Sequence, residues 1–179
     1  MNRKGHIGLA LLVSAPFALL VGLFLNPRWS LIVVGTALLA DRIPDTDQRL
    51  PFISHRGITH TVTFGIVASF VLAASFTTTA TITQPSSAFG VGILKNITTN
   101  LVLFAISLLG FTLGFAAHLI GDMLIEAYDY AVTPYWPFSS KPVALGWASA
   151  ESKHLWDWGL LLVGVLTNVG LVAGVLALN

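Results

Sequence analysis

Four stretches of the chain, each more than 20 residues long, contain no Asp, Glu, Lys or Arg: residues 5–27, 57–94, 96–121 and 158–179. About 20 apolar residues in a helix cross the ~30 Å hydrocarbon core of a bilayer. Each stretch can therefore hold a transmembrane helix. Only 9% of the residues are charged and 55% are hydrophobic, whereas soluble domains are roughly 25% charged. The composition thus excludes an ordinary water-soluble fold.

A fifth apolar stretch, residues 30–40, is much shorter. It would form about 16 Å of helix, either as a tilted span extended at both ends or as a half-helix inside the protein. Counting it as a crossing, we predict an all-α membrane helix bundle of about five transmembrane segments, the second of them short. The length of 179 residues fits one domain over 1–179. A cleaved secretory signal is the alternative for the first stretch, although its apolar run exceeds the usual ~7–15-residue core.

The basic residues predict how the bundle is oriented. Five crossings put the two termini on opposite sides, and seven of the nine Lys and Arg residues then fall on the side of the N-terminus. By the positive-inside rule that side is cytoplasmic. We therefore expect an integral protein of the cell or inner membrane with the C-terminus outside. The net charge of +1 gives no reason to expect a nucleic-acid partner.

The acidic residues and histidines, which were not used to build this topology, fall on or near the same side. This holds for all eight acids and all five histidines. Ionisable groups at membrane depth are costly and are usually functional. Because the chain has no cysteine, disulfides and thiolate metal ligands are excluded. A site built from His and Asp at the cytoplasmic end of the bundle is the main functional prediction.

Three short segments could build that site. His118 and Asp122 are four residues apart, hence on one helix face, where an imidazole and a carboxylate can share a zinc ion. A surface pair is the alternative. Glu126, one turn later, could join them or face water.

The second segment is His55-Arg56-Gly57-Ile58-Thr59-His60, directly before a long apolar stretch. We expect Gly57 to permit a tight turn, Thr59 to cap the helix and His60 to occupy its first turn. Two histidines and an arginine would then lie together at the membrane surface, where the helix enters the bilayer. An interfacial loop with snorkelling side chains is the alternative.

The third segment carries Asp41, Asp45 and Asp47, three carboxylates within seven residues. Such a group suits a divalent cation, and Pro44 stiffens the turn that presents Asp45. Asp41 could instead simply close the preceding helix. His6, just inside the first apolar stretch, is either a further ligand or an interfacial histidine.

Taken in order, these motifs resemble the YdjM-like family of membrane-bound, metal-dependent hydrolases. The resemblance covers about residues 5–138 and rests on His6-x-Gly8, Ile43-Pro44-Asp45-x-Asp47, His55-Arg56-Gly57-x-Thr59-His60, Ala117-His118-x3-Asp122, and Thr133 to Phe138. The chain has Gln48 where histidine is common and Thr61 where serine is common. Neither difference removes a candidate ligand.

The motif Ala117-His118-x-x-Gly121-Asp122 is also similar, more distantly, to the zinc-dependent phospholipase C and single-strand nuclease superfamily. That resemblance implies that Asp45, His60, His118 and Asp122 bind one metal, with Asp122 bridging to a second metal near His6. The other zinc ligands of those enzymes have no clear match, which leaves Asp41, Glu126 and His55 as candidates. One to three divalent ions are implied, zinc first, with manganese or magnesium as alternatives.

The resulting functional hypothesis is a hydrolase acting on a phosphate ester of a lipid or lipid-linked substrate, with membrane lipids as partners. A bound metal would activate water. Asp45 or Asp47 could accept its proton, Arg56 could hold the phosphoryl group, and His55 is a further catalytic candidate. The competing hypothesis is an ion- or proton-coupled transporter or a non-catalytic metal-binding regulator. Against transport, the opposite side offers Arg28 and Lys95 but no acid or histidine that could form an exit.

Overall fold

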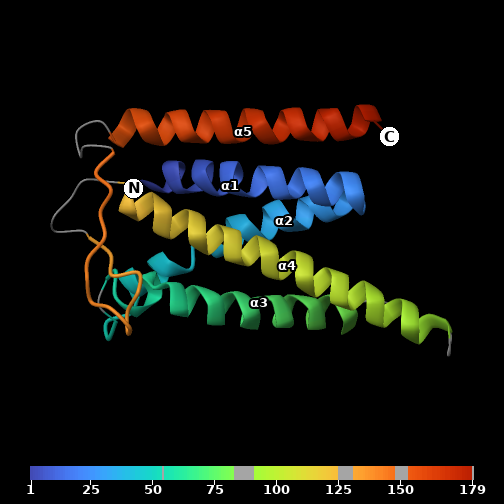
Figure 1. Ribbon diagram of the computed structural model, residues 1–179, viewed down its shortest axis with the longest axis horizontal. Coiled ribbons are helices and arrows are strands. Elements are labelled where there is room, and N and C mark those ends of the chain that lie inside the picture. The colour runs from blue at the N-terminus through green and yellow to red at the C-terminus, as the bar shows by residue number, and fades with distance from the viewer. Residues whose placement is uncertain (54, 83–90, 125–130, 148–152, 179) are drawn as a thin grey trace.

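The computed structural model describes residues 1–53, 55–82, 91–124, 131–147 and 153–178, and this part of the chain is all-helical apart from one isolated bridge between Val132 and Val143. The elements are α1 (Arg3–Phe24), α2 (Pro27–Ala40), the 3-10 turns η1 (Pro44–Arg49) and η2 (Ile58–His60), α3 (Val62–Ile82), α4 (Val91–Met123) and α5 (Lys153–Leu178) (Figure 1). The predicted all-α fold is confirmed.

Within the described residues, four helical segments are long and apolar enough to cross a membrane: Arg3–Phe24, Val62–Ile82, Ile97–Met123 and His154–Gly174. Helix α2 has only 14 residues, about 21 Å at ~1.5 Å per residue, so the second segment is short as predicted. It begins at Pro27, because the Asn26 side chain caps it by accepting the Arg28 N–H at 2.9 Å.

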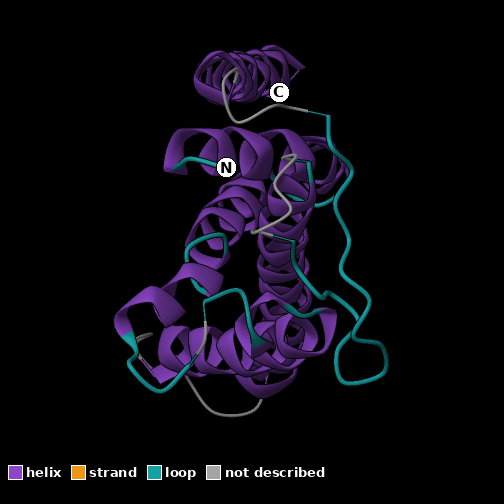
Figure 2. Cartoon of the chain, turned by 90° about the vertical axis from the view of Figure 1, so that its left-hand side faces the viewer, coloured by secondary structure: helices purple, strands orange, loops and turns teal. Residues whose placement is uncertain are grey.

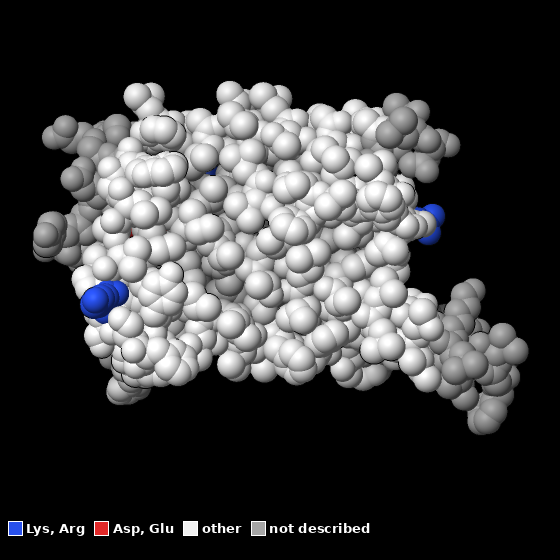
Figure 3. Space-filling model, in the orientation of Figure 1, with Lys and Arg blue, Asp and Glu red and all other residues white. Residues whose placement is uncertain are grey.

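The helices stack in layers, with α5 on α1, α1 on the pair α2 and α4, and α3 on the far side of α4 (Figures 1 and 2). The two termini lie at opposite ends of the bundle (Figure 1), as an odd number of helical segments requires. On the face shown in Figure 3, the exposed Lys and Arg side chains stand near the ends and the surface between them is uncharged. This is the surface expected of a protein that spans a bilayer.

Close packing of α2 against α4 positions one half of the polar site. A side chain on Gly110 would collide with Thr36 of α2, and one on Gly114 would collide with the backbone of Ala37. Residues 110, 114, 118 and 122 lie one above another on α4 because they are spaced by four. The stripe that accepts α2 therefore continues directly into His118 and Asp122, and the end of α2 at Asp41 arrives beside His118.

Helix α1 is held by α5. The backbones approach so closely that a side chain on Gly8 would strike the backbone of Leu160, and one on Gly164 would lie 2.6 Å from the Gly8 carbonyl oxygen. At the start of α1, the buried Asp157 carboxylate of α5 accepts the Asn2 N–H at 3.3 Å. A negative charge at a helix N-terminus is favourable. These contacts fix the first turns of α1, which carry His6.

Candidate metal centre

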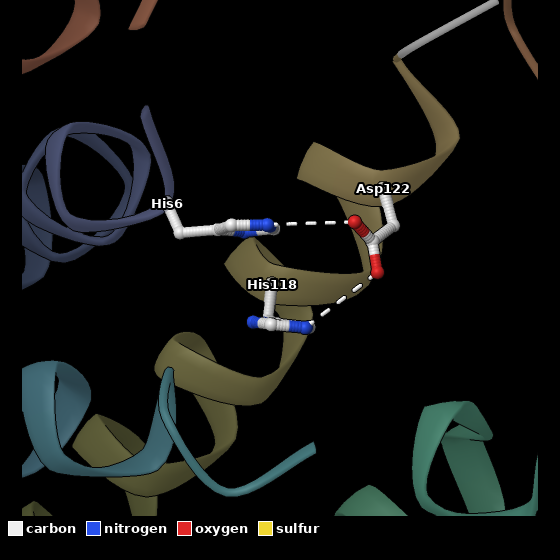
Figure 4. A group of neighbouring side chains, drawn as sticks. All are labelled: His6, His118 and Asp122. Atoms are coloured by element: carbon white, nitrogen blue, oxygen red, sulfur yellow. Dashed lines mark ion pairs between the residues drawn. The ribbon is translucent and has the colours of Figure 1, made fainter. Parts of the chain in front are cut away.

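His118 and Asp122 project from the last turns of α4 into the interior of the bundle (Figure 4). Both are buried, and His118 Nε2 lies 3.6 Å from Asp122 Oδ2. The alternative of a surface pair is therefore excluded. Their i, i+4 spacing puts both groups on the same side of the helix, as the sequence predicted.

His60 reaches the same point from η2, although the local structure differs from the prediction. Helix α3 begins at Val62, and its cap is Thr61, whose hydroxyl accepts the Phe64 N–H at 3.1 Å. The predicted cap, Thr59, instead donates its hydroxyl to Asp47 at 2.8 Å. The prediction of Thr59 as the cap was wrong because its hydroxyl binds Asp47, twelve residues away in the chain, instead of a backbone N–H of α3. His60 thus precedes α3 rather than occupying its first turn.

The tight turn before His60 also differs in detail. The left-handed residue is Arg56, with φ of 60°, rather than Gly57. This conformation is uncommon for a residue with a side chain and persists where surrounding contacts enforce it. Here Asp47 accepts the Arg56 N–H at 2.9 Å, which fixes the turn.

Asp45, on η1, completes a set of four side chains around one point. The His60 and His118 Nε2 atoms are 3.3 Å apart, and each lies 3.7 Å from Asp45 Oδ1. The same two nitrogens lie 3.4 and 3.6 Å from Asp122 Oδ2. A tetrahedron with zinc–ligand bonds of about 2.0 to 2.2 Å has edges of about 3.3 to 3.6 Å. Three of the five distances fall within this range and the two to Asp45, at 3.7 Å, lie just above it, so the donor atoms are spaced nearly as zinc ligands are.

Carboxylates stand behind the imidazoles of this site. His60 Nδ1 lies 3.3 Å from Asp47 Oδ2, and His118 Nδ1 lies 3.6 Å from Asp41 Oδ1. A carboxylate behind a metal-binding histidine holds its tautomer and orientation. Asp41, predicted as a metal ligand, thus lies behind the histidines. Asp41 Oδ1 and His118 Nδ1 are both buried, and neither has a hydrogen-bond partner among the described residues.

His6 of α1 lies beside His118, with the ring centroids 4.1 Å apart and the planes at 12°. Its Nε2 lies 3.4 Å from Asp122 Oδ1, the oxygen turned away from His60, and its Nδ1 lies 3.9 Å from Asp41 Oδ1 (Figure 4). A side chain on Gly121 would come within 3.0 Å of the His6 ring. The glycine of the His-x-x-Gly-Asp motif therefore makes room for His6, a role that the sequence analysis missed although the motif contained it.

Two cationic groups lie close to Asp122 Oδ1, the oxygen that His6 also approaches. Arg56 Nη2 is 3.3 Å and the Met1 amino group 3.4 Å from Asp122 Oδ1. His6, His118 and Asp122 could together hold an ion, but the Arg56 guanidinium already supplies a positive charge there. Arg56 therefore lies beside the donor atoms of Asp45, His60, His118 and Asp122, at the oxygen of Asp122 that faces away from His60.

Asp47 holds the residues at the solvent-exposed opening of the site, here called the mouth. Its carboxylate is buried and lies 3.0 Å from His55 Nδ1, in addition to accepting the Arg56 and Thr59 hydrogen bonds. Burial raises the pKa of Asp47, but these hydrogen bonds outweigh it and the net pKa is lowered. His55 is exposed at the mouth, with 42% of its side chain accessible. Asp45, Asp47 and His55 form a further group that could hold an ion.

The charges of Asp45 and His60 are coupled. The neighbouring His60 imidazole lowers the pKa of Asp45 to about 2, against the effect of burial. Burial lowers the pKa of His60, but the neighbouring Asp122 and Asp45 carboxylates outweigh it and raise the pKa to about 9. In the metal-free protein a proton on His60 therefore takes the place that a metal cation would occupy.

The predicted ligand Glu126 lies outside the described residues. Two further ionisable residues lie away from the centre: His154 is exposed on α5, and Asp157 is buried against the start of α1. The described residues that the structure brings together are His6, Asp41, Asp45, Asp47, His55, Arg56, His60, His118 and Asp122.

The model of the family "YdjM inner membrane protein" matches residues 1–178. The chain belongs to the YdjM inner membrane protein family. It is thus an integral membrane protein, as the apolar helices also indicate. No curated protein and no solved structure gave a significant match.

Proposed function

We propose that the protein is a metal-dependent membrane hydrolase that binds one divalent ion, zinc first, through Asp45, His60, His118 and Asp122. The observation that carries this proposal is the set of five ligand-to-ligand distances between 3.3 and 3.7 Å. The buried Asp122 Oδ2 has no hydrogen-bond partner among the described residues. A buried carboxylate oxygen facing two imidazole nitrogens calls for a cation.

The donor types support zinc. Two imidazole nitrogens and two carboxylate oxygens form a borderline set, which suits zinc, with manganese as an alternative. Four protein donors fill a tetrahedron, so hydrolysis requires the ion to accept a water as a fifth ligand. With that position filled, the ion would lower the pKa of the water to about 7 and polarise a phosphoryl oxygen.

The residues around the ion have separate tasks in this proposal. Arg56 binds the phosphoryl oxygens and stabilises their developing charge, since a guanidinium can bind phosphate with two hydrogen bonds. Its side chain is only 15% exposed and is held against Asp122. His55, oriented by Asp47, accepts and returns the proton at the mouth. Asp47 itself is a positioning residue, because His55, Arg56 and Thr59 already occupy its oxygens.

The substrate that we propose is a phosphate ester carried by a lipid. The polar centre is built from the ends of candidate membrane-spanning helices and the turns next to them, and the ends of such helices are where lipid headgroups are expected. We further propose that this end of the bundle faces the cytoplasm, because most of the basic residues belong to it.

The test is hydrolysis of a panel of lipid phosphates and phosphodiesters by metal-replete protein in detergent and in vesicles. Arg56→Gln should lower turnover while keeping the metal, and His118→Ala should abolish both. His154→Ala, which changes an exposed histidine away from the centre, is the matched control. No cleavage above the His118→Ala background, together with metal-dependent ion flux in proteoliposomes, would establish transport instead.

A further inference from the structure

The loops at the polar end of the bundle carry exposed apolar side chains. Phe52 is 97% and Phe138 87% exposed, and both lie outside the four spanning segments. Their exposed neighbours on the same loops are Leu50, Ile58, Tyr135 and Trp136. These six side chains are named the apolar rim. Loops that face water are normally polar, so an exposed apolar group of this kind marks an interaction surface.

The loops that carry the apolar rim are held in place by backbone hydrogen bonds. The Val62 N–H donates to the Pro134 carbonyl at 2.8 Å, which ties the loop 131–147 to the start of α3. The other end of that loop is tied to the end of α4, where the Leu145 N–H donates to Met123 at 2.6 Å. The half of the rim on loop 131–147, Tyr135, Trp136 and Phe138, is therefore tied to the helix bundle.

The rim flanks the candidate metal centre. Leu50, Phe52 and Ile58 lie between Asp45 and His60 in the chain, on the η1–η2 segment that also carries His55. The second half of the rim follows Pro134, which is bonded to the residue two positions after His60. Both loops lie at the end of the bundle where α3 begins (Figure 1).

We propose that the apolar rim inserts into the lipid leaflet next to the polar end of the bundle. The spanning helices hold this end at a membrane surface, so the leaflet is the apolar phase within reach. Aromatic side chains with basic neighbours are typical of the membrane interface, and Arg49 and Lys141 are exposed on the same two loops. The rim supplies apolar contact and the basic side chains face the phosphate headgroups.

Insertion of the rim determines how a substrate arrives. With both halves of the rim in the leaflet, the mouth at His55 opens toward the headgroups rather than toward bulk water. This consequence rests on the proposed hydrolase function, whereas the insertion itself does not. A lipid-embedded phosphate ester should be turned over faster than a water-soluble analogue with the same phosphate group.

Site-directed spin labelling tests the insertion directly, because the chain has no cysteine. Single replacements Phe52→Cys and Phe138→Cys carry a nitroxide in protein reconstituted into phospholipid vesicles. Thr46→Cys and Ser140→Cys, at exposed polar positions of the same loops, are the controls. Metal content equal to that of the unmodified protein shows that each variant is folded.

We expect the labels at 52 and 138 to collide more with oxygen than with a water-soluble nickel complex, and the control labels to show the reverse. Equal exposure of all four labels to the nickel complex would overturn the insertion. Protection of the rim labels from both reagents, with spin coupling between chains, would overturn it in favour of a contact with a second copy.

The substrate consequence has its own test. In Phe52→Ser/Phe138→Ser, turnover of a vesicle-embedded lipid phosphate should fall at least tenfold, while turnover of a short-chain soluble analogue stays within twofold. Equal losses on both substrates would contradict delivery from the leaflet. If no phosphate ester is cleaved by any form, the proposed hydrolase function fails, and the labelling result still decides the insertion.

Discussion

Metal affinity should rise steeply with pH, because a metal must displace the proton from His60. Burial lowers the pKa of this imidazole, but the neighbouring Asp122 and Asp45 carboxylates raise it to about 9. Below that pH, each unit of acidification costs a factor of about ten in apparent affinity, or ~1.36 kcal/mol. From pH 7 to pH 9 the affinity should therefore increase about 100-fold, ~2.7 kcal/mol, and then level off. Asp45, with a pKa of about 2, stays ionised throughout.

The measurement is a competition titration of zinc between the purified protein and a chelator whose affinity is known at each pH. Calorimetry in buffers of different ionisation enthalpy should show about one proton released per zinc at pH 7. Cobalt, which hydrolyses less readily, is the control for metal chemistry at high pH. A change in affinity of less than about threefold between pH 7 and 9, or binding without proton release, would refute the coupling of His60 to the metal.

Three further predictions concern packing, orientation and topology. Gly121→Ala places a Cβ 3.0 Å from His6 Nδ1 and should displace the His6 ring, which is stacked on His118. Turnover should therefore fall about 10- to 100-fold while the metal is retained. The control Gly159→Ala, whose Cβ would meet nothing within 4 Å, should leave turnover unchanged. Asp41→Asn removes the carboxylate behind His118 and His6, so zinc affinity in the same competition titration should fall about 10- to 100-fold, and unchanged affinity would mean that Asp41 orients neither ring. An impermeant thiol reagent should label Leu25→Cys in intact cells and Ser140→Cys only after permeabilisation; the opposite pattern would reverse the orientation.

The spanning helices and the polar end of the bundle could be predicted from the sequence because both follow from which stretches of the chain lack charged residues and which contain them. The four long helices fall within the charge-free stretches or extend them by a few residues at their ends, and α2 is short as its apolar run requires. The grouping of Asp45, His60, His118 and Asp122 followed from a family resemblance. Only the structure gives the distances that relate their atoms.

The finer features depend on contacts between distant segments. Spacing favoured Thr59 as a cap, but Asp47 binds its hydroxyl and Thr61 takes over. Asp41 was a ligand candidate from its charge alone; its place behind His118 results from the close crossing of α2 and α4 at Gly114. No local pattern contains that crossing.

Elemental analysis of the purified, detergent-solubilised protein tests the central claim most directly. The close spacing of the donor atoms of Asp45, His60, His118 and Asp122 predicts one divalent ion, zinc first, per chain. The ion should be lost in His118→Ala and in Asp122→Asn and retained in His154→Ala, provided that all three elute as the unmodified protein does on size exclusion. Metal content that is undiminished in both site variants, or absent from the unmodified protein after zinc loading, would contradict the assignment of the centre.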